Sequence, residues 1–237
     1  MKTFDGKIVD WLILFFIVFF LLLASYERNA LWRNEVALWK DCVKKSPEKE
    51  RTHHNLGYAY HEQGRVDDAQ EEYEEALDLN PYYALSMYNL GLVYYKKGLL
   101  DESIHHYKKA IELDPTFSDS FYNLGLAYYQ KGLYREAVDT YEKLLEVKPD
   151  YENAYVNLGL AYKGLKNWEK AIQSIQEELK GHPDNGNAYV ELGGLYKDRG
   201  EVPKALANFK RALASPSLSQ IEKVQKIVSS MEAGQTR

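Results

Sequence analysis

Two stretches of the chain are nearly identical, SMYNLGLVYYKKG at residues 86–98 and SFYNLGLAYYQKG at residues 120–132, and the second begins 34 residues after the first. The same interval separates five prolines, Pro47, Pro81, Pro115, Pro149 and Pro183. It also separates five glycines, Gly57, Gly91, Gly125, Gly159 and Gly193. A fixed period of this length is typical of stacked structural repeats. It divides the chain into five units, 50–83, 84–117, 118–151, 152–185 and 186–219.

Each unit has the pattern of a helical hairpin. Apolar and small residues recur at three-, four- and seven-residue steps on two separate stripes, which is the spacing of amphipathic helices. Between the stripes stands a second glycine, such as Gly98, which favours a turn after the first helix. Pro115 ends the second helix of its unit because it offers no N–H. Glycine in mid-helix costs about 1 kcal/mol against alanine, so we expect Gly91 and its equivalents where the two helices of a hairpin approach closely.

The signature L-G-x-x-Y … A-x-x-x-Y-x-x-A … P at this period resembles the tetratricopeptide repeat (TPR) family over residues 50–219. The resemblance implies an all-α fold, a right-handed α-solenoid of five TPR hairpins. It also implies a concave groove, lined by the first helices, that binds peptides or protein partners without catalysis.

Both ends of the array carry additional helical patterns. Residues 31–49 are predicted to be a half repeat, a second helix only, because Trp39, Cys42 and Pro47 fall at the positions of Tyr73, Ala76 and Pro81. Residues 220–237 are predicted to be a capping helix with a frayed tail, since a solenoid needs its terminal faces covered. Ser219 and Glu222 have the spacing of a capping box.

The N-terminal residues 1–30 are predicted to be a single-pass transmembrane anchor. The stretch WLILFFIVFFLLLA at residues 11–24 carries no charge. Counted from residue 8 to residue 26, a helix would span about 28 Å, close to the hydrocarbon thickness of a bilayer. The alternative is the apolar core of a signal peptide, although Asp10 and the poor cleavage site after Ala24 disfavour it.

Two signals disagree about which side of the membrane carries the repeats. A wide count of Lys and Arg would place the repeats in the cytoplasm. The stretch RNALWRNEVALWKDCVKKSP at residues 28–47, however, resembles the junction between membrane domain and TPR array in polytopic proteins related to O-mannosyltransferases. In those proteins the array faces away from the cytoplasm. We therefore expect a bacterial inner-membrane protein with extracytoplasmic repeats and bilayer contact through residues 8–26.

No catalytic, metal or cofactor site is predicted, and the chain is not expected to be an enzyme. The single cysteine, Cys42, excludes an intramolecular disulfide. The net charge of −5 gives no reason to expect nucleic acid. The adjacent histidine pairs 53–54 and 105–106 point about 100° apart on a helix, so we interpret them as solvated or groove-lining rather than metal-binding.

The predicted groove combines amides with aromatic and aliphatic side chains at fixed positions of the first helices. An asparagine recurs in four units, and it could hydrogen-bond the backbone of a peptide lying across repeats one to four. The predicted site residues are Asn55, Asn89, Asn123, Asn157, Tyr58, Tyr88, Leu92, Tyr95, Tyr122, Leu126, Tyr129 and Lys163. The alternative is that the tyrosines merely match the average repeat sequence. The family's carboxylate clamp is not expected, since His54 and Tyr58 replace its first lysine and asparagine.

The sequence thus predicts a membrane-anchored scaffold that recruits or assembles membrane and envelope proteins. The alternative function is an accessory, or detached C-terminal, module of a membrane glycosyltransferase system.

Overall fold

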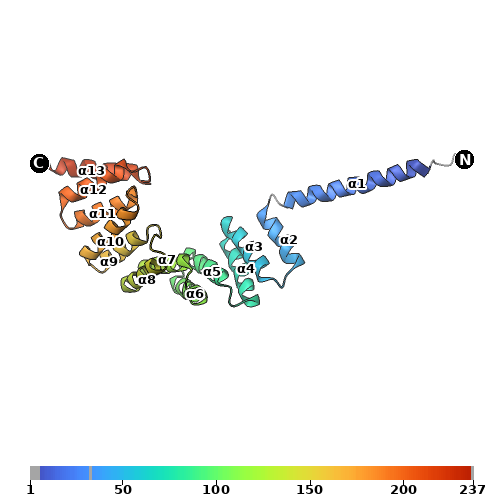
Figure 1. Cartoon of the computed structure of the whole chain (residues 1–237), viewed down its shortest axis with the longest axis horizontal. Coiled ribbons are helices and arrows are strands. Elements are labelled where there is room, and N and C mark those ends of the chain that lie inside the picture. The colour runs from blue at the N-terminus through green and yellow to red at the C-terminus, as the bar shows by residue number, and fades with distance from the viewer. Residues whose placement is uncertain (1–5, 32–33, 236–237) are drawn as a thin grey trace. The chain divides into compact units, whose positions relative to one another are not determined.

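The computed structural model describes residues 6–31 and 34–235, and within them it contains thirteen helices and no strand (Figure 1). The chain divides into two compact units, one ending at Val93 and the other beginning at Tyr94. The all-α repeat architecture predicted from the 34-residue period is confirmed.

The first unit contains four helices and most of a fifth. They are α1 (Gly6–Leu31), α2 (Glu35–Lys45), α3 (Glu50–Glu62), α4 (Val66–Leu79) and α5 (Ala84–Lys96), which crosses the boundary between the units. α3 and α4 form a hairpin, and α2 packs on α3. Tyr73 of α4 is fully buried and its ring faces Gly57 of α3, while Leu56 and Tyr60 of α3 are also buried.

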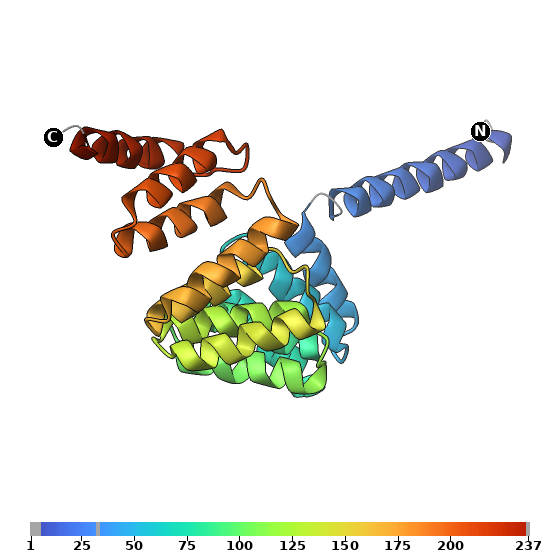
Figure 2. The same ribbon diagram turned by 60° about the vertical axis from the view of Figure 1, so that its left-hand side comes forward.

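The second unit continues the hairpins. Its helices after α5 are α6 (Leu100–Leu113), α7 (Ser118–Gln130), α8 (Tyr134–Val147), α9 (Ala154–Gly164), α10 (Trp168–Gly181), α11 (Gly186–Asp198), α12 (Val202–Ala214) and α13 (Ile221–Gln235). α7 pairs with α8, α9 with α10 and α11 with α12, and α13 packs on α12. Figure 2 shows these three last helices side by side. The five units, the half repeat 31–49 and the cap 220–237 stay predictions as domain boundaries.

The turn glycines act as the sequence predicts. Gly64, Gly98, Gly132 and Gly200 have φ between 74° and 79°. This left-handed conformation is the usual way to end a helix, and glycine adopts it without a steric penalty. At the equivalent position of the fourth unit stands Lys166, which has φ 60°.

The mid-helix glycines make room mainly for a large side chain of the second helix in the same hairpin. The sequence alone did not predict this contact. A Cβ on Gly57 would lie 2.9 Å from the ring of Tyr73, and one on Gly125 would lie 2.6 Å from the ring of Tyr141. In the same way Gly193 faces Phe209. The first helix therefore closes on a bulky residue of the second helix, and any Cβ would push the two apart.

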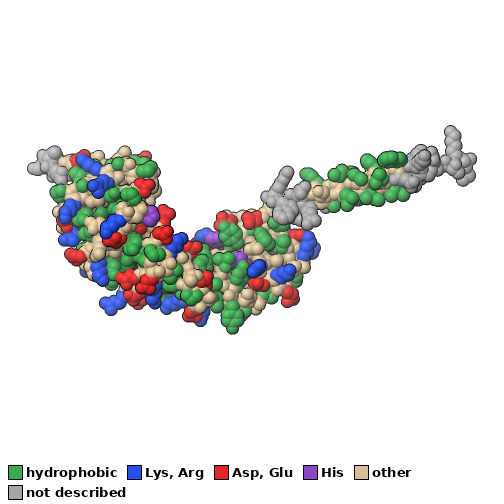
Figure 3. Space-filling model, viewed as in Figure 1, with side chains coloured by type: hydrophobic (Ala, Val, Ile, Leu, Met, Phe, Trp, Pro, Cys, Tyr) green, Lys and Arg blue, Asp and Glu red, His purple; other side chains and the backbone are tan. Residues whose placement is uncertain are grey.

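The predicted membrane anchor is wrong. Among the residues that the structure describes, none of the helices combines the length and the apolarity needed to cross a bilayer. α1 exposes hydrophobic side chains from Trp11 to Tyr26 (Figure 3), but charges at Asp10 and Glu27 bound this stretch. Residues 11–26 would span about 24 Å as a helix, against about 30 Å of hydrocarbon. The predicted transmembrane helix is therefore wrong, and so are the bilayer contact of residues 8–26 and the inner-membrane location with extracytoplasmic repeats.

The C-terminal helix covers the last hairpin. Val224 and Val228 of α13 are buried against a cluster that includes Phe209 of α12. The predicted capping box does not form, because α13 begins at Ile221 and the hydroxyl of Ser219 donates instead to Asn187 Oδ1 at 3.1 Å. The loop before α13 is thereby tied to the start of α11.

Candidate peptide-binding surface of the first helices

A cluster of tyrosine and amide side chains joins α7 to α9 in the second unit. The ring of Tyr122 lies 5.0 Å from that of Tyr151, centroid to centroid. Its hydroxyl accepts a 2.9 Å hydrogen bond from the side-chain amide of Asn157. Burial raises the pKa of Tyr122, which keeps the phenol neutral. We call Tyr122, Tyr151 and Asn157, with Asp119, the tyrosine–asparagine cluster.

Asp119 fixes the other side of this cluster. Its side-chain oxygen accepts a 2.8 Å hydrogen bond from the hydroxyl of Tyr151. Its backbone carbonyl accepts a 2.9 Å bond from the amide of Asn123. Two of the predicted amides, Asn123 and Asn157, are therefore already bonded within the chain, and a peptide would have to share or displace these bonds.

The twelfth residue of each 34-residue repeat lies on the first helix. Within the second compact unit, the row formed by these positions changes from aromatic to cationic along the chain. Tyr95 and Tyr129 are half-buried, and burial raises the pKa of both phenols. The next members of the row are Lys163, whose Nζ lies 2.8 Å from Asp198 Oδ2, and Lys197. The predicted Leu126 is half-buried on α7, between Tyr122 and Tyr129 in sequence.

The predicted residues of the first unit differ widely in exposure. Tyr58 is 45% exposed and accessible to a ligand, whereas Asn89 is only 8% exposed. Asn55, Tyr88 and Leu92 are half-buried. Asn89, which belongs to the first of the two near-identical stretches, is therefore the least accessible of the four predicted amides.

The interpretation of His53 and His54 as solvated or groove-lining is wrong. His54 is 4% exposed, and its Nδ1 lies 2.9 Å from the hydroxyl of Ser86. Burial lowers the pKa of His54 to about 4, so the ring is neutral at physiological pH. His53 lies 2.8 Å from Glu72 Oε2 and 2.9 Å from the carbonyl of Pro47, so it joins α3 to α4 and to the loop before α3.

Sequence reasoning missed two residues of the surface. Tyr151 ends the third unit and Tyr134 begins the second helix of that unit, outside the first-helix positions that were considered. The ring of Tyr134 lies 5.4 Å from that of Tyr129. The period offered a signal for Tyr151, because Tyr83 and Phe117 precede it at 34-residue intervals.

Two hollows on the second helices are weaker candidates. One, of about 360 Å³, is lined by α6, α7 and α8, and the other, of about 210 Å³, is lined by their equivalents α8, α9 and α10. Three pairs of equivalent lining positions have opposite charges, namely Lys108 and Glu142, Glu136 and Lys170, and Lys143 and Glu177. Because the charges reverse from one unit to the next, the two hollows do not share one ligand preference.

Comparisons with known proteins identify the repeats. Residues 57–98, 93–132 and 127–166 match the sequence profile described as TPR repeat, and residues 156–219 match a second profile described as tetratricopeptide repeat. No curated protein gives a significant match. The resemblance of residues 28–47 to the O-mannosyltransferase junction is not supported by any of these matches.

Solved structures share the fold. The crystal structure of MamA is 28% identical, with a TM-score of 0.63 over 67% of this chain and 93% of MamA. YrrB, described as a TPR protein with an unusual peptide-binding site, is 19% identical, with a TM-score of 0.65 over 79% of this chain and 97% of YrrB. A thermophilic TPR protein of Thermus thermophilus is 24% identical, with a TM-score of 0.59 over 78% of this chain and 99% of its own. At these identities the last two show the fold alone.

Proposed function

Because this chain belongs to the tetratricopeptide repeat family, we propose that it is a non-catalytic scaffold that binds a peptide segment of a partner protein along its first helices. The observation that supports this most directly is the tyrosine–asparagine cluster. It presents the half-buried rings of Tyr122 on α7 and Tyr151 in the loop before α9, next to the side-chain amide of Asn157 on α9. Tyrosine and asparagine are effective contact residues because they combine a large rigid area with hydrogen-bonding groups.

The ligand that fits this surface is an extended or helical segment with apolar side chains. Tyr122, Leu126 and Tyr129 offer apolar area on one helix, α7, and Asn157 offers an amide on the next first helix, α9. Amides can bond the backbone of a peptide whatever its sequence, while the side chains choose among ligands. No comparison supports a link to glycosyltransferases.

Site-specific crosslinking tests the proposal. A photoreactive amino acid at position 126 should crosslink partner proteins in cell extract, and the Asn123→Leu/Asn157→Leu variant should lose these crosslinks. The matched control carries the same photoreactive residue at position 146, on the exposed side of α8. Denaturation midpoints of all variants must agree. Partners that crosslink equally at 126 and 146, or that persist in the double variant, would contradict the proposal.

A further inference from the structure

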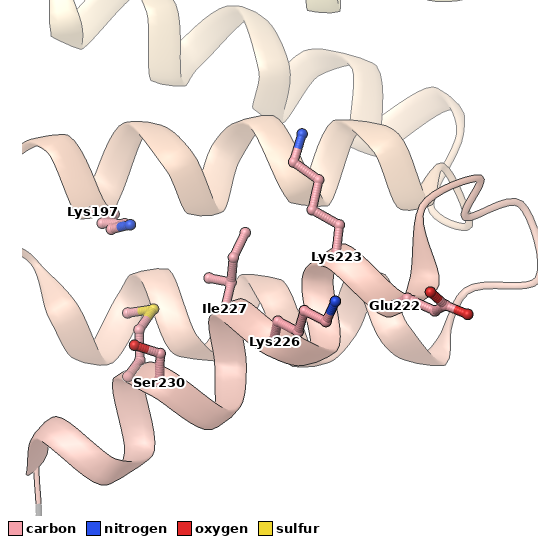
Figure 4. A pocket seen from close by; sticks show the side chains of 7 residues that line it. Lys197, Glu222, Lys223, Lys226, Ile227 and Ser230 are labelled. Atoms are coloured by element: carbon pink, nitrogen blue, oxygen red, sulfur yellow. The ribbon is translucent and has the colours of Figure 1, made fainter.

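A pocket of about 580 Å³ lies between α11 and the C-terminal helix α13. Lysines from both helices surround it: Lys197 from α11, and Lys223 and Lys226 from α13. In Figure 4, Ile227 lies between Lys197 on one side and the other two lysines on the other. Its volume is in the range of pockets that hold ligands.

The three lysines differ from their neighbours in forming no ion pair among the described residues. Within the described part of the chain, no carboxylate lies within ion-pair distance of Lys197, Lys223 or Lys226. On α12, by contrast, Lys204 is 2.7 Å from Glu201 and Lys210 is 2.7 Å from Glu232. Three cations that face one pocket without an ion pair can attract an anionic ligand.

The floor of the pocket is apolar. Ile227 and Met231 line it and also pack against the buried cluster around Phe209. A ligand that fills the pocket would therefore place an apolar group on these two side chains and an anionic group near the lysines. Inorganic ions offer only the second, whereas a peptide segment offers both.

The acidic groups nearby form no ion pair with the three lysines among the described residues. Glu222 lines the pocket, but its carboxylate points away from the lysines in Figure 4. Glu191 of α11 is half-buried, and burial raises its pKa against the opposing effect of Lys163 and Lys223. Asp198, at the end of α11, is already paired with Lys163 at 2.8 Å.

The pocket also continues a row described above. Lys197 stands 34 residues after Lys163 and 68 after Tyr129, at the same position of successive first helices. A segment that contacts Tyr129 and passes Lys163 would reach Lys197 next on the following first helix. The capping helix then adds two lysines that no repeat position supplies.

We propose that this pocket binds an acidic segment of a partner polypeptide, with carboxylates at Lys197, Lys223 and Lys226 and an adjacent apolar side chain on Ile227 and Met231. The inference rests on the proposed function, because the same peptide would continue from α7 and α9. It adds the chemistry of the ligand and a role for α13 beyond covering the last hairpin.

The test uses the full-length chain and two pools of fluorescein-labelled random peptides. One pool ends in Leu-Asp-Glu with a free carboxylate, and the other ends in Leu-Asn-Gln-amide. Fluorescence anisotropy should show tighter binding of the acidic pool, and Lys223→Gln/Lys226→Gln should weaken that binding about tenfold. Raising salt from about 50 to about 300 mM should weaken the acidic pool selectively, because screening acts on charge pairs.

The matched control is Lys204→Gln/Lys210→Gln, which removes two paired lysines from α12 and should leave the affinity unchanged. Equal binding of the two pools, or an equal loss in the control, would overturn the proposal. Inorganic phosphate at a concentration equal to that of the peptide carboxylates should not displace the acidic pool. Displacement would indicate a small-anion site and would also overturn the proposal. Binding of phosphatidylserine vesicles in place of the acidic pool would overturn it as well.

The two proposals fail in distinguishable ways. If crosslinking at position 126 persists in Asn123→Leu/Asn157→Leu while the unsubstituted chain prefers the acidic pool and Lys223→Gln/Lys226→Gln loses that preference, the proposed function alone is wrong. If the amide variant loses its partners but the two pools bind alike, the acidic preference alone is wrong.

Discussion

At the scale of single residues, each hairpin depends on one absent side chain. Four first-helix glycines each face a bulky side chain of the second helix in the same hairpin. The pairs are Gly57 and Tyr73, Gly125 and Tyr141, Gly159 and Ile175, and Gly193 and Phe209. The four bulky residues are at most 2% exposed, so the contact lies in the centre of each hairpin. Interiors of this density do not absorb an added methyl group without moving something.

Gly125→Ala should destabilise the protein by about 1 to 3 kcal/mol, the usual cost of overpacking a core. Its Cβ would stand 2.6 Å from the ring of Tyr141. Denaturant unfolding followed by circular dichroism measures the change. Gly194→Ala is the matched control, because it is also mid-helix but its Cβ meets nothing within 4 Å. That control should gain about 0.5 to 1 kcal/mol from helix propensity, and a gain for both variants would contradict the packing.

His54 makes stability depend on pH. Its pKa is lowered by burial from 6.5 to about 4, so the unfolded chain takes up a proton more readily than the folded protein. The neutral ring contributes its full stability above pH 6.5, and this contribution is lost as the pH falls towards 4. The difference amounts to about 3 kcal/mol at 1.36 kcal/mol per unit of pKa.

His54→Gln should therefore flatten the fall in unfolding free energy between pH 7 and pH 4, measured by urea denaturation at several pH values. Carboxylates also titrate below pH 5, so the quantity of interest is the wild-type curve minus the variant curve. His105→Gln, at an exposed position on α6, should follow the wild-type curve. A variant curve for His54→Gln parallel to the wild type would contradict the role of its burial.

At the scale of elements, the α9–α10 hairpin departs from its neighbours. Both non-glycine residues with positive φ in the described chain, Asn153 and Lys166, belong to it. Glu178 of α10 replaces the alanine or leucine of other units and is 1% exposed. Its Oε1 accepts from the backbone N–H of Asn153 at 3.2 Å and from the amide of Asn185 at 3.1 Å. A buried polar network here replaces the apolar packing of the other units.

Lys166→Gly should stabilise the protein by about 1 kcal/mol. A residue with a Cβ in the left-handed region costs about 1 to 2 kcal/mol, and glycine removes this strain. The greater freedom of glycine in the unfolded chain offsets part of that gain. The thermal midpoint should rise accordingly. Lys166→Ala removes the same charge but keeps a Cβ, so it should bring no such rise. Equal effects of glycine and alanine would exclude the backbone as the cause.

At the scale of the whole molecule, the period in the sequence predicted the hairpins and their turns, because prolines and glycines act locally. What it could not predict depends on contacts between elements. Buried His54 is bonded to Ser86, which lies 32 residues further along the chain on the next first helix. The hydrogen bond from Asn157 to Tyr122 joins two consecutive 34-residue repeats. The predicted anchor is wrong for another reason, because the uncharged apolar stretch between Asp10 and Glu27 is too short to cross a bilayer. The site residues stay predictions.

Deleting residues 118–151 should leave a folded, shorter array, because it removes α7 and α8 as a complete hairpin. Stability in repeat proteins is close to a sum of units and the interfaces between neighbours. Helical content should fall in proportion to length, and unfolding should stay cooperative at a lower midpoint. Deleting only 118–134 removes one helix of the pair and should give an aggregated or largely unfolded product. A misfolded 118–151 deletion would show that the hairpins are not interchangeable.

Because a bulky residue of the second helix packs on a glycine of the first helix in the same repeat, the array can be lengthened by duplicating whole repeats. Four of the 34-residue repeats carry both halves of this contact, so a duplicated repeat of this kind arrives with its internal packing already made. New hairpins can therefore be added by copying a stretch of gene, without a matching change anywhere else in the core. Afterwards only the outward-facing residues need to diverge, as they have between Lys108 and Glu142. Residues 86–98 and 120–132 are as alike as such a copy would leave them.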